Sequence, residues 1–521
     1  MGLSRRTFLH ATGGAAASLS GAMGQTSSAP ASSKPNLILY MTDELRAESV
    51  ACYGNPLVKT PNIDRLAREG TRFDQCHVQN PVCAPSRCSL LTGWPVHVHG
   101  HRSLYDLLHP DEPNLFRYLK EGGYDVYWFG KNDLLATDSF ASSVTEAQSR
   151  PGGTSFTRNP YAIDDPHYYS FLFTAGPDRR QTSDYANLQA AIDVLERRSD
   201  KPFCLFLPLL FPHPPYAAPA DFHNMYSPAE LPPLRPTGLP KQPRFHQALR
   251  SKMRLDQLSD TDFRKIQSVY LGMVSYADWL LGELLEALHR TNHDRDTAIF
   301  FFADHGDFAG DYGLVEKWPN AMNDVLTRVP LIARIPGYEG GHVGKEMVEL
   351  YDVMATCLEL TGIPARHTHF ARSLTSQLRG EPGDSHRAAF CEGGYNTNEP
   401  QCFEPLAQFG NPANIYYPKV ALQNRQPDTI TRSTMIRTLD YKLIYRPDDQ
   451  SELYDLKNDP RELRNVFGDP GYQAQQTQLF GRMMDWYVRT ADVAPKQRDP
   501  RSLPATPTHA GDRYRRTADG S

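Results

Sequence analysis

Four segments of the chain are unbroken apolar or aromatic runs, without the alternation of apolar and polar residues that marks a half-exposed strand. They cover residues 36–43, 124–131, 203–210 and 297–306. Continuous runs of this length are typical of strands that are covered on both faces, as in a parallel sheet. The pattern therefore predicts four buried parallel strands.

Between these runs, apolar residues recur at steps of three and four, which is the period of an amphipathic helix. The clearest examples are residues 60–70, 112–123, 185–198 and 263–290. In the first of them, Thr60 is placed to cap the helix, Pro61 stands in the first turn and Gly70 ends it. Alternating strands and helices predict an α/β domain with a large, mixed but mainly parallel sheet sandwiched by helices.

The character of the chain changes near residue 380. Residues 433–466 are typical of short strands joined by turns, and residues 471–492 have the period of an amphipathic helix. We predict a large α/β domain over residues 35–383 and a smaller α+β domain with an antiparallel sheet over residues 384–493. Residues 494–521 are polar and rich in proline, which predicts a disordered tail.

The first residues have the pattern of an export signal. Arg5 and Arg6 precede a weakly apolar run rich in alanine and glycine, which predicts a twin-arginine signal over residues 1–24 and a flexible leader over residues 25–34. The run is too short to span a bilayer. A basic, disordered N-terminus is the alternative. The signal would send the protein to the periplasm or outside the cell, without stable membrane insertion.

Charge and cysteine content narrow the possible chemistry. The net charge of -5 gives no reason to expect binding to nucleic acid or to an anionic membrane surface. The eight cysteines form no CxxC pair, which argues against structural zinc and favours small buried side chains for most of them. Cys83, in the stretch NPVCAPSRCSLLTG, could be a structural thiol, a disulfide partner, a metal ligand or a reactive centre.

Polar residues end or closely follow each of the four predicted strands. In open α/β sheets, ligands bind outside the carboxyl ends of the strands. Acids, a lysine and histidines at this edge predict a site there: Asp43 with Glu44, Lys131, His213, and Asp304 with His305. The alternative is that these polar residues only mark where the strands end.

Residues 83–93, CAPSRCSLLTG, resemble the signature of the type I sulfatases, which belong to the alkaline-phosphatase-like superfamily. The matching positions are Cys83, Pro85, Ser86, Arg87, Leu91, Thr92 and Gly93. Further stretches are similar to that family in the same order, namely GYDVYWFGK, PHPPY, ADHGD and ELYDLKNDPRELRNV. The resemblance covers roughly residues 35–470.

The resemblance implies a modified Cys83 and a bound cation. In this family a maturation enzyme oxidises the cysteine to formylglycine (3-oxoalanine), an aldehyde that hydrates to a gem-diol. The implied metal ligands are Asp43, Glu44, Asp304 and His305, together with residue 83. Hard oxygen ligands favour calcium, with magnesium as the alternative. Glu44 departs from the family, which often has aspartate at this position.

The resemblance also implies catalytic roles. Arg87, Lys131 and Lys317 match the cations that bind the sulfate group, and His213 matches the general acid that protonates the leaving alcohol. Asp133 stands where the family often has a histidine that handles the proton of the diol. Asp133 could act as the base in its place, or another group could take over that task.

A group of histidines follows the signature. His97, His99 and His101 alternate, so on a strand they would share one face. Neighbours on that face lie about 7 Å apart, which argues against a shared zinc ion. His101 and Arg102 are instead expected to contact an anion or a sugar.

Taken together, the resemblance implies a sulfatase that hydrolyses a sulfate ester. Residues 395–417 are rich in aromatic side chains, and by analogy they favour a sulfated carbohydrate over a small aryl sulfate. A phosphonate monoester or phosphodiester hydrolase of the same superfamily is the first alternative. A protein that binds sulfated glycans without hydrolysing them is the second.

Overall fold

The computed structural model describes residues 34–148, 158–197, 199–495 and 501. The predicted signal, all but the last residue of the leader, and nearly all of the predicted tail lie outside these residues. From Pro35 onward the chain is one compact unit. The boundary expected at residue 384 lies within this unit, just before β9, and it stays a prediction.

The four predicted strands are consecutive neighbours in one eight-stranded sheet, in the order β4-β3-β5-β1-β6-β7-β2-β8. The central strand β1 (Asn36–Thr42) pairs in parallel with β5 (Phe203–Pro208) and with β6 (Thr297–Ala303). On the far side of β5 lies β3 (Asp125–Phe129), followed by the short edge strand β4 (Glu146–Gln148). The parallel arrangement brings the carboxyl ends of β3, β5, β1 and β6 to one edge.

The other half of the sheet contains strands that the apolar runs did not predict. Strand β7 (Arg328–Arg334) is antiparallel to β6 and to β2 (Thr71–His77), and β2 is parallel to β8 (His342–Glu349). Polar residues interrupt β2, and its pairing shifts register between Phe73 and Cys76. A broken pattern of this kind leaves no continuous run to recognise. The sheet is mixed and mainly parallel, as predicted.

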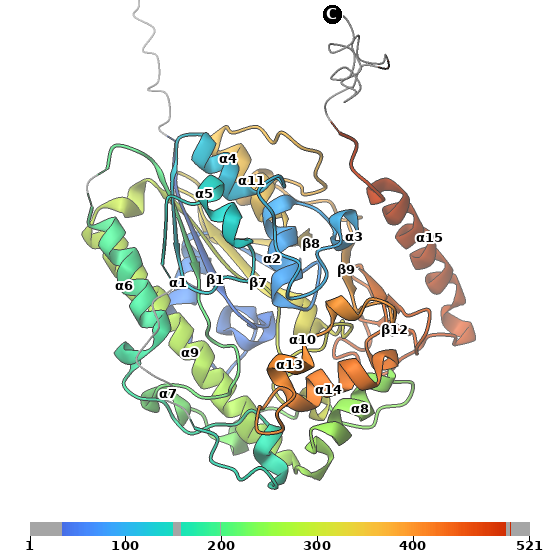
Figure 1. The fold of residues 1–521 in the computed structure, drawn as a ribbon. Helices are drawn as coiled ribbons and strands as arrows, with labels where there is room; N and C mark the ends of the chain where they lie inside the picture. The colour runs from blue at the N-terminus through green and yellow to red at the C-terminus, as the bar shows by residue number, and fades with distance from the viewer. Residues whose placement is uncertain (1–33, 149–157, 198, 496–500, 502–521) are drawn as a thin grey trace, which may run out of the picture. The chain divides into compact units, whose positions relative to one another are not determined.

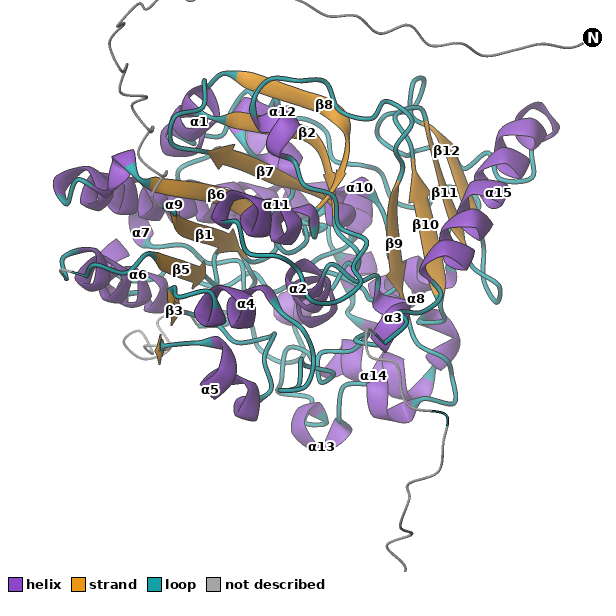
Figure 2. Cartoon of the chain, turned by 90° about the horizontal axis from the view of Figure 1, so that it is seen from above, coloured by secondary structure: helices purple, strands orange, loops and turns teal. Residues whose placement is uncertain are grey.

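Helices cover both faces of the large sheet (Figures 1 and 2). One contacting group consists of α1 (Pro61–Glu69), α6 (Ser183–Leu195), α7 (Ala220–His223) and α9 (Asp260–Arg290). The other consists of α2 (Cys83–Thr92), α4 (Leu115–Glu121), α5 (Phe140–Ser143) and α11 (Asp352–Thr361). The predicted helices are thus observed as α1, α4, α6 and α9.

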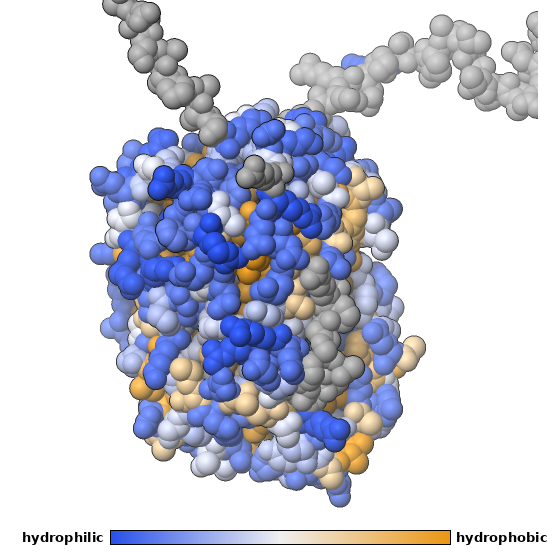
Figure 3. All heavy atoms as spheres, turned by 90° about the vertical axis from the view of Figure 1, so that its left-hand side faces the viewer, coloured by the Kyte–Doolittle hydropathy of each residue, from blue (hydrophilic) through white to orange (hydrophobic). Residues whose placement is uncertain are grey.

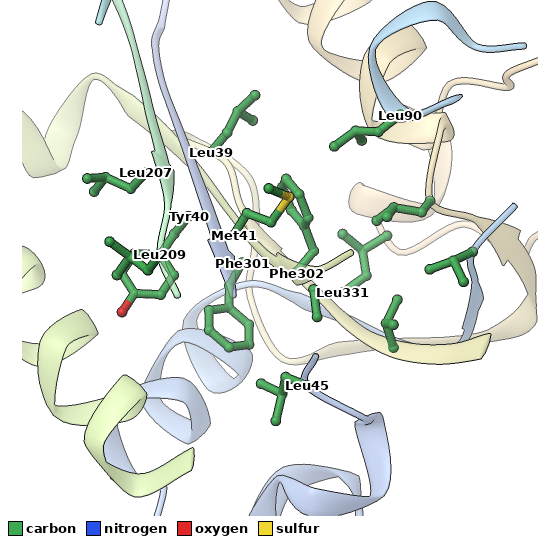
Figure 4. Packing of buried hydrophobic residues seen from close by; sticks show 14 of the residues in the cluster. Leu39, Tyr40, Met41, Leu45, Leu90, Leu207, Leu209, Phe301, Phe302 and Leu331 are labelled. Carbon is green, nitrogen blue, oxygen red and sulfur yellow. The ribbon is translucent and has the colours of Figure 1, made fainter. Parts of the chain in front are cut away.

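The core explains why β1 has no polar alternation (Figure 4). The Tyr40 ring stacks on Phe301 of β6 at 5.7 Å between centroids, and its hydroxyl donates to the Ala277 carbonyl of α9 at 2.9 Å. Leu39 and Met41 alternate with Tyr40 along the strand and are also fully buried. Both faces of the strand therefore lie in the core.

The start of α1 corrects one local prediction. Thr60 stands at the cap position, but its side chain does not cap the helix. The Asp278 carboxylate of α9 instead accepts the N–H groups of Asn62 and Ile63, at 2.9 and 2.8 Å. The Asp278 carboxylate on α9 therefore caps α1 in place of the Thr60 side chain.

A separate four-stranded antiparallel sheet follows, in the order β12-β11-β10-β9. Its strands are β9 (Ala389–Gly393), β10 (Ser433–Arg437), β11 (Tyr441–Tyr445) and β12 (Glu452–Asp455). Helix α15 (Gln473–Thr490) packs on it, as predicted. Residues 394–432, between β9 and β10, include α13 (Leu406–Phe409) and α14 (Tyr417–Arg425). We call residues 394–432 the insertion.

The remaining α-helices are short connecting elements: α3 (Val96–His99), α8 (Arg244–Lys252), α10 (Asp324–Thr327) and α12 (Thr375–Leu378). Among the described helices, none combines the length and the apolar character that crossing a membrane requires. The face in Figure 3 is largely hydrophilic, with hydrophobic residues scattered or in small groups.

Candidate active site

The carboxyl ends of the two central strands bring four predicted ligands together. Asp43 and Glu44 follow β1, Asp304 and His305 follow β6, and all four side chains are buried. Asp304 Oδ1 accepts the backbone N–H of His305 at 2.9 Å and that of Glu44 at 3.2 Å. One carboxylate therefore orders both turns.

Cys83 reaches this edge as the first residue of α2. Its Sγ lies 3.1 Å from His305 Nε2 and 3.5 Å from Asp43 Oδ1. The Ser86 hydroxyl, in the same first turn, donates to the Asp304 carbonyl at 2.6 Å. The signature segment is thus a buried helix start docked against both strand ends.

Two cations surround Asp43. Arg87 Nη2 donates to Asp43 Oδ2 at 2.9 Å, and Arg87 Nε donates to Asp304 Oδ2 at 2.8 Å. Lys131 Nζ lies 2.7 Å from Asp43 Oδ2, 2.8 Å from Asp133 Oδ2 and 3.9 Å from Cys83 Sγ. Arg87 is therefore a brace between two carboxylates, whereas Lys131 lies beside residue 83.

Burial and charge set the protonation of this centre. Burial opposes the charge on Asp43, but Lys131 and Arg87 outweigh it and hold the pKa of the carboxyl well below its usual range. Burial, and then the Asp43 carboxylate, raise the pKa of the Cys83 thiol well above its ordinary value. Without a cation, unmodified Cys83 is a neutral thiol and a poor nucleophile.

A second cluster is built around Glu44. Lys317 Nζ bonds to the Glu44 carboxylate and lies 3.4 Å from His213 Nε2, which is itself 3.1 Å from Glu44 Oε1. Burial, and then Lys317, lower the pKa of His213 well below its usual value. Burial also opposes the charge on Lys317, but the nearby Glu44 and Asp43 carboxylates favour it, and the pKa of Lys317 lies well above its usual value. Of Lys317 and His213, Lys317 therefore holds the proton, and burial also raises the pKa of Glu44 well above its usual value.

The backbone around His213 is held from α6. Asp184 accepts the N–H groups of Leu210 and Phe211 at 2.8 Å each. His213 Nδ1 contacts the Pro214 carbonyl oxygen at 2.6 Å, which makes Nδ1 the donor and leaves Nε2 facing Glu44 and Lys317. The loop that presents His213 is thus anchored on a buried carboxylate.

The residues present fit a divalent cation. Two groups of ligand atoms each lie within 4.8 Å of one another, Asp43 with Glu44, Cys83 and His213, and Asp43 with Cys83, Asp304 and His305. His305 Nδ1 contacts the Gly306 carbonyl oxygen at 2.8 Å, so Nε2 remains for a ligand. Glu44 Oε2 is buried without a hydrogen-bond partner in the described chain. Glu44 falls in the group with His213, whereas His305 falls in the other.

A cavity of about 280 Å³ opens beside this centre, and five predicted residues line it: Cys83, Lys131, Asp133, His213 and Lys317. Further lining residues were not predicted individually from the sequence: Tyr105, Glu316, Tyr395, Glu404, Phe409, Tyr416 and Lys419. Four of them come from residues 395–417, whose aromatic content was the available signal. Glu316 and Lys419 form a buried ion pair, and Lys419 Nζ donates to the Lys317 carbonyl at 2.6 Å.

Two predicted substrate contacts lie elsewhere. Neither His101 nor Arg102 is among the residues lining this cavity. The ring nitrogens of His101 contact the Asp106 carbonyl at 2.9 Å and Glu112 Oε1 at 2.8 Å, and Arg102 forms two hydrogen bonds to Glu399. Both side chains are therefore engaged within the protein.

The nearby histidines also differ from the strand geometry considered for them. His97 and His99 lie on the short helix α3, so the expected shared strand face does not exist. His97 Nδ1 lies 2.7 Å from Glu392, and His99 stacks on Trp94 at 4.2 Å between ring centroids. His99 Nδ1 and His101 Nε2 both lie near Glu112 Oε1, at 3.3 and 2.8 Å, whereas His97 has its own partner.

The family model for sulfatases matches residues 35–363, and that for the C-terminal part of N-sulphoglucosamine sulphohydrolase matches residues 410–488. The chain therefore belongs to the sulfatase family, a class of sulfuric ester hydrolases with an alkaline-phosphatase-like fold. Together the matches cover the large sheet, strands β10, β11 and β12 of the smaller sheet and most of α15.

Among curated relatives, a multifunctional alkaline phosphatase superfamily protein of Trinickia caryophylli is 26% identical, over 88% of this chain and 96% of its own length. Human iduronate 2-sulfatase is also 26% identical, over 86% and 93%. The N-acetylglucosamine-6-O-sulfatase of Bacteroides thetaiotaomicron is 24% identical, over 89% and 88%.

A solved structure supports the fold. The phosphonate monoester hydrolase of Agrobacterium radiobacter superposes with a TM-score of 0.70 at 21% identity, over 88% of this chain and 96% of that one.

Proposed function

We propose that this protein hydrolyses a sulfate ester on a carbohydrate, using a formylglycine made from Cys83 and a divalent cation. One observation carries the proposal. Cys83 begins a buried helix within 3.5 Å of Asp43 and His305, and its unmodified thiol is held neutral. A position so well placed and so poorly reactive as a thiol favours an oxidised form as the working group.

The cation would be held by Asp43, Asp304, His305 and residue 83, with Glu44 Oε2 available beside them. The Asp43 and Asp304 carboxylates, with Glu44 in the neighbouring group, favour calcium, with magnesium as the alternative. When both groups are present, the hydrated aldehyde supplies a nucleophilic oxygen and the cation lowers its pKa and offsets negative charge.

The cationic side chains near residue 83 would have different roles. Lys131 and Lys317 line the cavity, where they would bind the sulfate group and stabilise charge as it builds on the bridging oxygen. Arg87 is enclosed between Asp43 and Asp304, so its role would be to hold these carboxylates and residue 83 in position.

His213 and Lys317 would together protonate the leaving alcohol. His213 Nε2 lies 3.4 Å from Lys317 Nζ, so a proton can pass from the lysine to the imidazole and on to the oxygen. Beside Lys131, Asp133 is the candidate base in place of the family's histidine. Its bond to Lys131 also fixes the position of that ammonium group.

The preference for carbohydrate is supported by two features. Relatives that cover most of the chain are named for glucosamine and iduronate sulfatase activities, and aromatic residues line the cavity. Sugar rings pack well on aromatic side chains that also offer a hydroxyl.

The proposal includes two partners and a location. A maturation enzyme would modify Cys83, and the predicted twin-arginine signal would export the folded and already modified protein to the periplasm or beyond. A direct check is the mass of the tryptic peptide FDQCHVQNPVCAPSR from protein made in its natural host. A free thiol at Cys83 in active protein would contradict the mechanism.

A phosphonate monoester or phosphodiester hydrolase is the second candidate, favoured by the solved structure of the Agrobacterium radiobacter enzyme. Comparing kcat/KM for 4-nitrophenyl sulfate with that for bis(4-nitrophenyl) phosphate separates the two, and the sulfate ester is expected to be preferred. Chelation with EDTA should abolish turnover, and calcium should restore it. Faster phosphodiester turnover would favour the second candidate.

A further inference from the structure

The cavity beside Cys83 has two chemically different sides. One carries Lys131, His213 and Lys317, which lie around the strand ends and belong to the sulfate-binding side. The other side comes mainly from the insertion, which also contributes Lys419. It carries the Glu404 carboxylate and several aromatic rings. No step of the proposed hydrolysis uses that carboxylate.

Glu404 is held rigidly. Its Oε1 accepts a hydrogen bond from Gln423 Nε2 at 2.7 Å, and its backbone N–H donates to Gln423 Oε1 at 3.0 Å. Gln423 is only 1% exposed, and its neighbour Asn424 donates to the Glu404 carbonyl at 2.9 Å. Glu404 Oε2 accepts no hydrogen bond within the described chain. The carboxylate thus has one oxygen fixed by α14 and the other left for a ligand.

Three tyrosines complete this side. The hydroxyls of Tyr105, Tyr395 and Tyr416 are not bonded to any other described residue, and all three residues line the cavity. Each hydroxyl can donate and accept, whereas the Glu404 carboxylate, when ionised, only accepts. Burial raises the pKa of Glu404, and Gln423 and Lys317 oppose that rise. A ligand that satisfies Glu404 must therefore bring a hydrogen-bond donor to it.

We infer that Glu404 selects the leaving group of the sulfate ester by accepting a hydrogen bond from its hydroxyl or ammonium group, and that it excludes leaving groups with a second anionic group at that position. The inference rests on the proposed function, since it assigns this cavity to the alcohol side of a sulfate ester. The expected substrate is then a sulfate ester of a neutral sugar or of an amino sugar.

The physical basis is the asymmetry of buried hydrogen bonds. A bond to a charged acceptor contributes about 1.5–3 kcal/mol, and a carboxylate facing another anion loses its hydration without gaining a partner. A site built to bond a polar group of the substrate discriminates more strongly than an apolar pocket can.

The test compares Glu404→Gln with the wild type on four esters: 4-nitrophenyl sulfate, glucose 6-sulfate, glucosamine 6-sulfate, and glucosamine 6-sulfate with a second sulfate on its nitrogen. The amide in Glu404→Gln keeps an oxygen that can accept the hydrogen bond from Gln423, but it removes the negative charge of the carboxylate. For each protein, kcat/KM on each sugar is divided by kcat/KM on 4-nitrophenyl sulfate, so that differences in folded or modified fraction cancel. Glu381→Gln removes an exposed carboxylate and serves as the matched control.

In the wild type, both monosulfated sugars are expected to exceed the disulfated one. In Glu404→Gln the ratio for the monosulfated sugars should fall about 10-fold, and the ratio for the disulfated sugar should rise. A larger loss for glucosamine 6-sulfate than for glucose 6-sulfate identifies the ammonium group as the bound donor, and equal losses identify a hydroxyl. Glu404→Asp keeps the charge on a shorter side chain and should show the loss for the monosulfated sugars without the gain for the disulfated one.

Unchanged ratios in Glu404→Gln, or ratios that match those of Glu381→Gln, overturn the inference. A wild type that hydrolyses 4-nitrophenyl sulfate but prefers the disulfated sugar overturns it as well, while leaving the proposed function intact. A wild type that hydrolyses no sulfate ester contradicts the proposed function itself.

Discussion

The active-site cavity joins two regions built in different ways. The strand-end centre consists of short motifs on α2 and after β1 and β6, and its ionic side chains are buried and bonded to one another. The insertion comes from a segment more than three hundred residues downstream of Cys83, and it presents aromatic rings and one carboxylate with a free oxygen. The difference shows that the strand-end centre is largely paired within itself, with Glu44 Oε2 and Arg87 Nη1 as exceptions among the described residues, whereas the cavity wall keeps groups available for a ligand.

The largest effect is expected for Asp43→Asn, in the strand-end centre. This change leaves Arg87 and Lys131 without their shared partner and removes a predicted cation ligand. We expect activity to fall by at least about 1,000-fold and the free energy of unfolding to fall by about 3–5 kcal/mol. Kinetics and denaturant unfolding measure the two effects.

Asp352→Asn is the control for Asp43→Asn, because Asp352 is an equally buried carboxylate that pairs with Arg387 at 2.6 Å away from the cavity. It should lose similar stability but retain turnover per folded molecule. Normal activity in Asp43→Asn would mean that the strand-end centre is not the reacting centre.

A substitution in the cavity wall should change substrate binding more than it changes the rate of the chemical step. Tyr416→Leu removes an aromatic face and a hydroxyl from the cavity, and we expect KM for a sugar sulfate to rise about 10-fold with a smaller change in kcat. Tyr416→Phe, which keeps the ring, should lie between the wild type and Tyr416→Leu. A loss confined to kcat would instead place Tyr416 in the reacting centre.

The loop that carries His213 offers a pH-dependent test. Burial raises the pKa of Asp184 to about 6, above the value of about 4 for an unfolded chain. The folded state binds this proton more tightly, so ionising Asp184 between about pH 4 and pH 6 lowers stability, by up to about 3 kcal/mol.

Asp184→Asn cannot ionise, so the melting-temperature advantage of the wild type over this variant should shrink as the pH rises from about 5 to about 8. Asp138→Asn, at an exposed position, controls for the loss of one charge. An advantage that grows with pH would reverse the assigned sign.

The smallest effect is expected outside both regions. Arg102→Ala breaks the partly exposed pair with Glu399, which should cost less than about 1 kcal/mol. KM for a sugar sulfate should change less than about twofold, because Arg102 does not line the cavity. A large rise in KM would restore the hypothesis, drawn from the sequence, that Arg102 contacts the substrate.

Much of the centre could be predicted because its groups are local in sequence. An apolar run followed at once by an acid predicts a strand end, and parallel strands bring such ends to one edge. Asp43, Asp304 and His305 were found in this way, and the signature segment placed Cys83 and Arg87 one helical turn apart. Strands β2 and β8 were missed because polar residues interrupt them and leave no continuous apolar run.

The class of protein, the central parallel strands and most candidate residues of the reacting centre could be predicted from the sequence alone, because each depends on local periodicity or on a compact motif. Three features could be seen only in the tertiary structure. Arg87 braces two carboxylates, Glu44 groups with His213 and Lys317, and the insertion forms part of the cavity wall. These features depend on contacts between segments far apart in the chain. No local pattern records such contacts, because burial and charge pairing arise only when the segments meet.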